Sequence, residues 1–313
     1  MKKNIKHFLC FTAVAAGTIH FINRFIDNTA EMKHMLNTDH GDFYTAKTGN
    51  MYYQKHGKGS PILLIHDLSP IASSYEWCRF SKKLEKQHTV YTVDLLGCGR
   101  SEKPYLTYTN YLYVQLITDF IHDVIGESPD IIVSHKSASF VIQAAGMDSN
   151  LIKSITAINP VSLEILPVKS DPFLKIKKTL LELPVIGTFL YNIETIEGNI
   201  EKTLRKTYFH NPQLVSTKML DTYYESSHKE SSHGKYLMAS IKCGFLDHAI
   251  EYSLKNMETP LYIIGSIEHS SDIRTMESYR KVNSKIKVAY LPDAGTIPQL
   301  EMPEKILELM QTF

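Results

Sequence analysis

Cysteine is scarce in this chain, and its few cysteines lie far apart. Cys10, Cys78, Cys98 and Cys243 are the four among 313 residues, and no two of them form a C-x-x-C pair. Disulfide scaffolds and cysteine-based metal centres need paired, closely spaced cysteines. We therefore expect no disulfide framework and no metal site, and no motif in the chain calls for a cofactor.

An excess of charge of either sign is also absent. The 34 basic and 33 acidic residues leave a net charge of +1, so no overall field draws the protein to nucleic acid or to an anionic membrane. Any partner must therefore be recognised by a local surface and not by the overall charge. The sequence does not identify a protein partner. The length and the 43% hydrophobic content predict one large domain with an insertion.

No apolar run in the chain reaches the length that a bilayer crossing requires. Lys2, Lys3 and Lys6 precede the stretch 8–22, which is apolar or small except for two threonines and a histidine. A membrane-spanning helix needs about 20 such residues. An uncleaved signal anchor that extends to Phe25 is one interpretation, because polar side chains near its end can reach the membrane surface.

Two other interpretations of this N-terminal segment stay open. Ala13-Val-Ala15 has the small-x-small form of a cleavage site, which would make the segment a signal peptide and the protein secreted. The segment could instead be an amphipathic helix packed on the body. We predict that residues 1–30 are a single-pass membrane anchor, with the body outside the cytoplasm because the lysines precede the apolar run.

Beyond the first 42 residues, short β-branched runs alternate with longer helical patterns. This alternation predicts an α/β fold, a mostly parallel eight-stranded sheet with helices on both faces. It lapses over 162–255, which predicts a helical cap inserted between two parts of the core, 43–161 and 256–313. The expected strands are Met51–Lys55, Pro61–His66, Thr89–Asp94, Asp130–Ser134, Ser154–Asn159, Pro260–Gly265 and Ile286–Leu291, and the expected helices include Tyr75–Lys86, Tyr108–Ile125 and Ser139–Met147.

Four short motifs follow these strands in a definite order. They are Leu64–Trp77, Val93–Pro104, Asp130–Ser139 and Asp293–Pro303. Together they resemble the α/β-hydrolase superfamily, and specifically its cap-containing branch with the haloalkane dehalogenases and epoxide hydrolases. The resemblance runs from about residue 43 to the C-terminus. It implies a site in which nucleophile, acid and histidine follow one another along the chain.

The third motif has the form of a nucleophile elbow, in which a strand enters a tight turn and then a helix. The family pattern G-x-S-x-G places small residues on both sides of the nucleophile. Ser134 and Ala138 supply them here, and Lys136 stands at the position where the resemblance implies a nucleophile. A lysine has a pKa of about 10.4 and is no nucleophile near pH 7 unless strongly desolvated. We therefore expect that this position has lost its hydrolytic chemistry.

The remaining triad positions also depart from the family pattern. Thr296 stands where the resemblance implies the histidine base, and a threonine cannot accept and return a proton near pH 7. Glu268 follows a strand at the position of the acid. These triad-equivalent positions, Lys136, Glu268 and Thr296, are therefore expected to be non-catalytic, and Lys136 and Glu268 could form an ion pair in the emptied site.

The loop that would supply oxyanion donors is altered as well. His66 opens it, but Asp67 replaces the usual glycine, so the donor would be the backbone of Leu68. A carboxylate facing the pocket would repel a developing oxyanion. The resemblance further implies that Ser137 and Trp77 lie at the oxyanion site or the pocket.

These departures leave two functional hypotheses. The first is a membrane-associated pseudoenzyme that binds a small apolar or anionic ligand, or acts as an interaction protein. The alternative is an active hydrolase of small or lipid-like esters, with Ser137 as a relocated nucleophile and His135 or His269 as its base. Whether the chain is an enzyme stays open at this point.

Overall fold

The computed structural model describes residues 2–38, 40–166, 171–268 and 270–313. These residues form one eight-stranded sheet in the order β1-β2-β4-β3-β5-β6-β7-β8. Strands β1 and β2 are antiparallel to their neighbours, and the others run parallel. The predicted fold class is confirmed. The strands are β1 Asp42–Ala46, β2 Gly49–His56, β3 Pro61–Ile65, β4 Thr89–Val93, β5 Asp130–Ser134, β6 Ser154–Ile158, β7 Leu261–Ser266 and β8 Lys287–Leu291.

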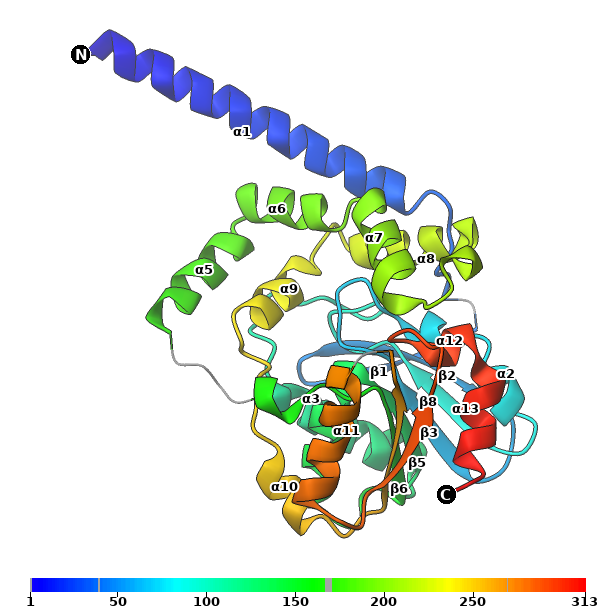
Figure 1. The fold of residues 1–313 in the computed structure, drawn as a ribbon. Coiled ribbons are helices and arrows are strands. Elements are labelled where there is room, and N and C mark those ends of the chain that lie inside the picture. Colours follow the sequence, from blue (N-terminus) through cyan, green and yellow to red (C-terminus); the bar gives the residue numbers. More distant parts are fainter. Residues whose placement is uncertain (1, 39, 167–170, 269) are drawn as a thin grey trace.

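Helices cover both faces of the sheet (Figure 1). Strand β3 illustrates why, because all five of its residues are buried and successive side chains point to opposite faces. Leu63 and Ile65 join one core cluster, whereas Ile62 and Leu64 join the other. The body helices are α2 Ser81–Leu84, α3 Asn110–Phe120, α4 Ala138–Met147, α10 Glu251–Asn256, α11 Ser270–Val282, α12 Pro298–Glu301 and α13 Pro303–Met310.

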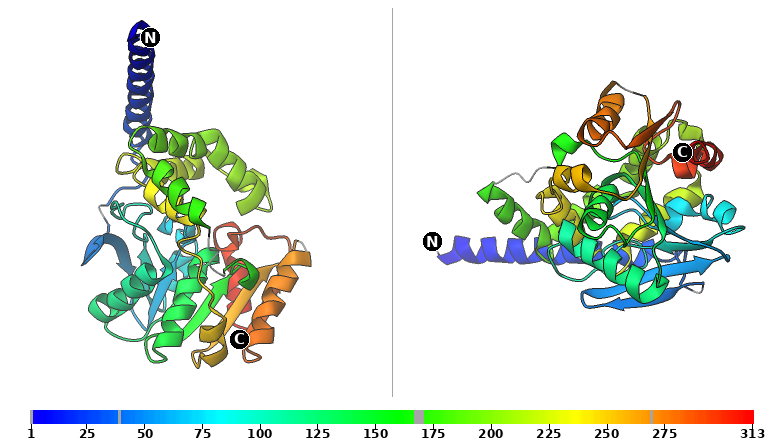
Figure 2. Two further views of the ribbon diagram at one scale, coloured as in Figure 1. Left: turned by 90° about the vertical axis from the view of Figure 1, so that its left-hand side faces the viewer. Right: turned by 90° about the horizontal axis from the view of Figure 1, so that it is seen from below.

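The insertion between β6 and β7 is helical in its described residues, as predicted, and most of it lies over one end of the sheet (Figures 1 and 2). Helix α10 falls inside the predicted cap range but packs against α4 and α11 of the body. The cap elements are α5 Pro172–Glu182, α6 Ile186–Glu194, α7 Glu197–Thr203, a π-helical turn Leu204–Tyr208, α8 Thr217–His228 and α9 Lys235–Lys242.

The N-terminal segment is a single helix, α1, Lys2–Ala30. Its first half projects from the molecule, and its second half lies on the cap (Figures 1 and 2). Buried Asn23 donates to the Val185 carbonyl at 3.2 Å and accepts from the Asn192 amide at 3.0 Å. Over the described residues, no helix combines the length and hydropathy needed to span a bilayer. The predicted spanning anchor has no support among these residues.

Candidate functional site

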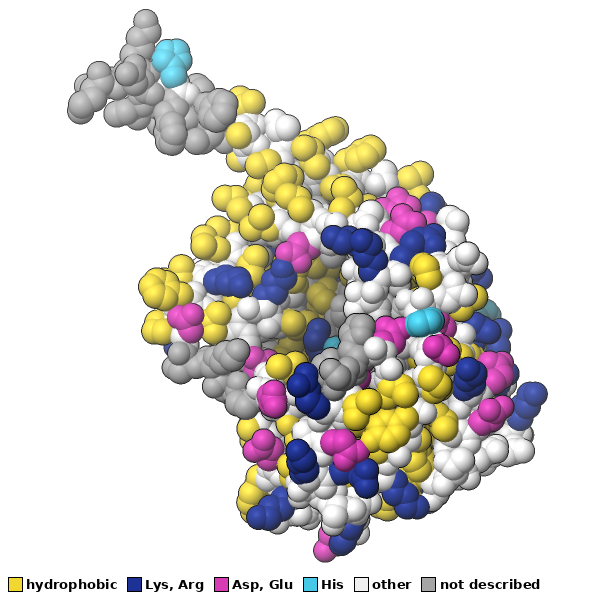
Figure 3. Space-filling view, in the orientation of Figure 1, with side chains coloured by type: hydrophobic (Ala, Val, Ile, Leu, Met, Phe, Trp, Pro, Cys, Tyr) yellow, Lys and Arg dark blue, Asp and Glu magenta, His cyan; other side chains and the backbone are white. Residues whose placement is uncertain are grey.

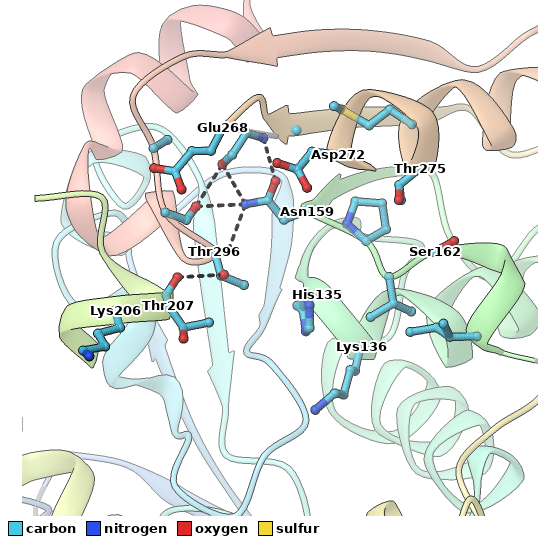
Figure 4. Close-up of a pocket in the computed structure, with 18 residues that line it drawn as sticks. His135, Lys136, Asn159, Ser162, Lys206, Thr207, Glu268, Asp272, Thr275 and Thr296 are labelled. Atoms are coloured by element: carbon cyan, nitrogen blue, oxygen red, sulfur yellow. Dashed lines mark hydrogen bonds between the residues drawn. The ribbon is translucent and has the colours of Figure 1, made fainter. Parts of the chain in front are cut away.

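A cavity of about 400 Å³ lies between the cap and the carboxyl ends of the central parallel strands. This is where open α/β sheets bind ligands. His135 and Lys136 enter it from the turn after β5, and Asn159 enters from the end of β6 (Figure 4). A hollow between cap and body is also visible in the space-filling view (Figure 3). All three predicted triad-equivalent positions, Lys136, Glu268 and Thr296, line this cavity.

Lys136 also lines two smaller adjoining cavities, of about 80 and 160 Å³. The smaller one is mainly apolar, although Asp247 also lines it; its apolar residues are Leu68, Phe140, Val161, Ile165, Leu166, Ile241 and Leu246. No hydrogen bond or ion pair of the Lys136 ammonium is found among the described residues. This half-buried cation therefore stands where a polar cavity meets an apolar one.

The strained residue of the elbow is His135, one position before the predicted Lys136. Strand β5 ends at Ser134, and His135 has φ +48°, a backbone conformation that non-glycine residues rarely adopt. An elbow places its nucleophile on this strained turn. The motif register was misread because Ser134 and Ala138 are small, but the backbone centres the turn on His135, with Val133 and Ser137 as its flanks.

The carboxylate of Asp67 lies against the backbone N–H that follows the strained residue of this elbow. Its Oδ1 accepts from the Lys136 backbone N–H at 3.1 Å and lies 3.2 Å from His135 Nδ1. Burial raises the pKa of this carboxyl, but the charges of His135 and Lys136 outweigh burial and hold the pKa well below its usual range. An ionised carboxylate thus uses a backbone donor that an oxyanion would need.

A second buried carboxyl, Glu76, supports the Asp67 loop from behind. The Asp67 N–H donates to Glu76 Oε2 at 3.1 Å, and the Gln299 amide donates to Ser134 Oγ at 3.0 Å and to Glu76 Oε2 at 3.3 Å. Burial raises the Glu76 pKa well above its usual value and favours the neutral form of this carboxyl. No sequence pattern pointed to Glu76 or Gln299, although both lie inside the motif segments 64–77 and 293–303.

His66 holds the same loop in place and takes no part in the cavity lining. Its Nδ1 donates to the Asp67 carbonyl at 2.7 Å, and its Nε2 accepts from the Leu95 N–H at 3.0 Å. Both ring nitrogens are therefore used by the backbone. Burial lowers the pKa of His66 and keeps the ring neutral.

Ser137 and Trp77 lie away from the cavities. Ser137 is fully buried, and its hydroxyl donates to the His66 carbonyl at 2.6 Å. Trp77 is fully buried in the core cluster on the other face of the sheet, against Phe80. Neither lines the described cavities, so this geometry supports neither the predicted pocket role of Trp77 nor a nucleophilic Ser137. His269, the other proposed base, lies outside the described residues.

At the position where the family has its histidine base, Thr296 and its neighbours form a network of hydrogen bonds (Figure 4). The Thr296 hydroxyl donates to the Thr207 carbonyl of the cap at 2.9 Å. The Asn159 amide donates to the Gly295 and Thr296 carbonyls at 3.1 and 2.9 Å, and its oxygen accepts from the Ser266 N–H at 2.7 Å. These groups tie cap, β6 and β7 together and leave no imidazole at position 296.

Glu268 pairs with the cap and not with Lys136. Its carboxylate contacts His210 Nδ1, and this hydrogen bond raises the pKa of His210. No ion pair within 4 Å joins Glu268 to Lys136, so the predicted pairing is wrong. Within the described residues, no cluster of side chains suited to a metal ion is found.

Comparisons with known proteins agree with this architecture. The model of the "Alpha/beta hydrolase family" matches residues 62–309. The chain therefore belongs to the alpha/beta hydrolase family. A haloalkane dehalogenase of Agrobacterium fabrum (strain C58 / ATCC 33970) is 25% identical over 133 residues, which cover 42% of this chain and 43% of that protein. The matched region thus spans less than half of that relative.

Solved structures resemble the chain over most of its length. A membrane phospholipase A, described as a bacterial virulence factor, has a TM-score of 0.68 at 18% identity, covering 100% of this chain and 97% of that one. The epoxide hydrolase CorEH has a TM-score of 0.70 at 17% identity, covering 87% and 97%. A bromoperoxidase from Bacillus anthracis has a TM-score of 0.69 at 14% identity, covering 87% and 98%. At these identities the likeness establishes the fold.

Proposed function

We propose that this α/β-hydrolase-fold protein no longer hydrolyses esters and instead binds a small anionic ligand beneath its cap. The observation that carries the proposal is the Asp67 carboxylate, which accepts the Lys136 backbone N–H at the elbow. Acyl transfer needs that donor for a developing negative charge, and a resident anion there opposes the charge. Thr296 adds to the argument because it cannot act as the base that the mechanism needs.

The ligand class follows from the position of Lys136. The half-buried Lys136 ammonium has no ion pair within 4 Å among the described residues, although its charge lowers the pKa of Asp67, so an anion bound in the cavity would be its direct partner. The apolar cavity beside it suits a short hydrocarbon group. A carboxylate with an aliphatic tail matches both features, with its head at Lys136 and its tail against Leu68 and Phe140.

Labelling by a fluorophosphonate and turnover of p-nitrophenyl acetate test the loss of hydrolysis. We expect the natural protein to be inert, and the triple variant Asp67→Gly, His135→Ser, Thr296→His to label. A matched triple variant with Lys136→Ser in place of His135→Ser should stay inert, because position 136 lies off the strained turn. Turnover by the natural protein that disappears in His135→Ala would contradict the proposal and favour an active hydrolase.

Calorimetric titration with octanoate tests the binding site. We expect the natural protein to bind octanoate and Lys136→Met to bind at least about tenfold more weakly, a loss of about 1.4 kcal/mol. Lys153→Met is the matched control, because Lys153 is exposed and pairs with Asp130 on the body. No binding by the natural protein, or equal binding by Lys136→Met, would overturn the ligand class.

We also propose that the chain associates with membranes through its N-terminal helix. The solved structure described as a membrane phospholipase A matches the whole length of this chain, and the match includes α1. The side of the membrane on which the body lies, predicted from the leading lysines, stays a prediction. Co-sedimentation of the full chain with lipid vesicles tests the association, and a chain that stays in solution at low salt would contradict it.

A further inference from the structure

The cap helix α5 presents an apolar face that no other part of the described structure covers. None of its eleven residues is buried. Phe173, Ile176 and Leu180 follow one another at spacings of three and four residues, which places them on one side of the helix. They are 75%, 59% and 52% exposed. A helix in water normally turns such a side toward a core.

The same surface continues into α6. Exposed apolar residues also lie in the connection, along α6 and just after it, and hydrophobic side chains gather on this part of the molecule in Figure 3. Single exposed leucines are common on proteins, whereas a row of this length marks an interaction site. We name this row the α5–α6 stripe; its residues are Phe173, Ile176, Leu180, Leu183, Ile186, Leu190, Ile193 and Ile196.

Helix α1 extends the apolar surface beside the stripe. Val14, Phe21 and Phe25 are exposed on it, at spacings of seven and four residues. The Asn23 contact with the Val185 carbonyl holds α1 next to the start of α6. The views in Figures 1 and 2 show the projecting half of α1 and the helices α5 and α6 on the same side of the molecule.

Basic side chains with no carboxylate partner among the described residues lie around this surface. Lys175 and Lys177 are exposed on α5, and Arg24 is exposed on α1. Two of the carboxylates nearby are paired with cations, Glu182 with Lys178 and Glu194 with Lys242, whereas Asp171 accepts the Phe173 N–H. The sequence of α1 contains no acidic residue before Asp27. Free basic groups beside an apolar face match a lipid surface with anionic headgroups.

We propose that the α5–α6 stripe and the exposed face of α1 together dock on an anionic bilayer, lying in its interface without crossing it. This inference rests on the membrane association proposed above and names the surface that makes the contact. A second copy of the chain is a poorer occupant. In a symmetric pair the patch would meet itself, and the lysines and arginine around it would face their own copies.

Vesicle co-sedimentation of the full chain tests the docking surface. The probes are phosphatidylcholine vesicles with and without phosphatidylglycerol. We expect binding to the mixed vesicles, weaker binding to pure phosphatidylcholine, and a decrease with added salt. Ile176→Asp with Leu190→Asp should lower the partition coefficient at least about tenfold, because two apolar groups would no longer enter the interface. Tyr252→Asp with Ile273→Asp, exposed on α10 and α11, is the matched control and should bind normally.

Three further results separate the outcomes. Lys175→Glu with Lys177→Glu should reduce binding to the mixed vesicles and hardly change binding to phosphatidylcholine. If Phe21→Asp with Phe25→Asp abolishes binding and the stripe variant binds normally, association through α1 stands and this inference is wrong. If the natural chain is a dimer by light scattering, and the stripe variant is monomeric while vesicle binding is absent, the stripe binds a second copy and both membrane proposals fail.

Discussion

Two neighbouring buried carboxyl groups at the base of the elbow, those of Asp67 and Glu76, have pKa values shifted in opposite directions. The Asp67 carboxylate is held by the charges of His135 and Lys136 and by the Lys136 backbone N–H, and these keep its pKa low despite its burial. Glu76 has no cation beside it, and its Oε1 makes no hydrogen bond among the described residues. The two groups should therefore change the stability of the fold in opposite directions as the pH changes.

Substitution of Asp67 by asparagine should destabilise the fold at neutral pH and progressively less in acid. The pKa of Asp67 is lowered on folding, so its contribution is present above the unfolded value of about 3.9 and is lost as the pH falls below it. We expect a loss of about 1–3 kcal/mol at pH 7 for Asp67→Asn. Urea unfolding of both proteins between pH 3 and pH 7 measures the difference, and a pH-independent difference would contradict this account.

Substitution of Glu76 by glutamine should have the reverse pH dependence. The Glu76 pKa is raised on folding, so its contribution is full below the unfolded value and is lost as the pH rises toward the folded one. Each pH unit in that window changes the free energy of unfolding by up to about 1.4 kcal/mol. Glu76→Gln should therefore gain stability relative to the natural protein between pH 5 and pH 8, by the same urea titration. If the stability of Glu76→Gln relative to the natural protein stays constant or falls over that range, the raised pKa of Glu76 is contradicted.

At the scale of single elements, the elbow shows where sequence reasoning ends. Strand β5 and helix α4 were predicted, because a buried β-branched run and a helical pattern are local signals. The residue at the turn was misplaced by one, because small residues fit either register and only the φ of His135 distinguishes them. Strand β1 was missed because its five residues are mostly exposed and carry no alternation of apolar side chains.

The cap elements above the cavity depend on pairings that no local pattern contains. Glu268 was placed at the acid position from its strand, but its partner His210 comes from the cap, 58 residues away in sequence. The same holds for Thr296 and Thr207. These contacts between distant segments form only when the insertion docks on the body. The sequence therefore predicted a helical cap but not the residues that hold it to the body.

The link between His210 and Glu268 should make the cap edge sensitive to pH. The pKa of His210 is raised, so its contact is full below about pH 6.5 and weakens as the pH rises through the folded value. Hydrogen exchange of residues 204–214, corrected for the intrinsic rate, should therefore become faster between pH 6 and pH 8 in the natural protein. His210→Gln should remove this pH dependence, and His88→Gln, on the body, should keep it. Identical profiles for the natural protein and His210→Gln would contradict the role of this pair.

For the molecule as a whole, α1 joins the cap through a small set of buried polar contacts. Ser232 donates to Asp27, and burial raises the pKa of that carboxyl. The backbone N–H groups of Met35 and Leu36 donate to Glu225 on α8 at 2.6 and 3.0 Å. Buried polar groups of this kind specify one docked position, because any displacement leaves them without partners.

Replacing Asn23 by alanine should release α1 from the cap while the body stays folded. The change removes the acceptor of the buried Asn192 Nδ2 group and one of two hydrogen bonds at the Val185 carbonyl, which keeps the Phe189 N–H, at a cost of about 1–3 kcal/mol. That cost corresponds to about a tenfold to hundredfold increase in opening of residues 19–30, measured by hydrogen exchange. Arg24→Ala is the matched control, because Arg24 is exposed on the next position and should exchange as the natural chain does. If Asn23→Ala instead accelerates exchange in β3 and β5, α1 is part of the cooperative core, and its docking cannot be separated from the stability of the sheet.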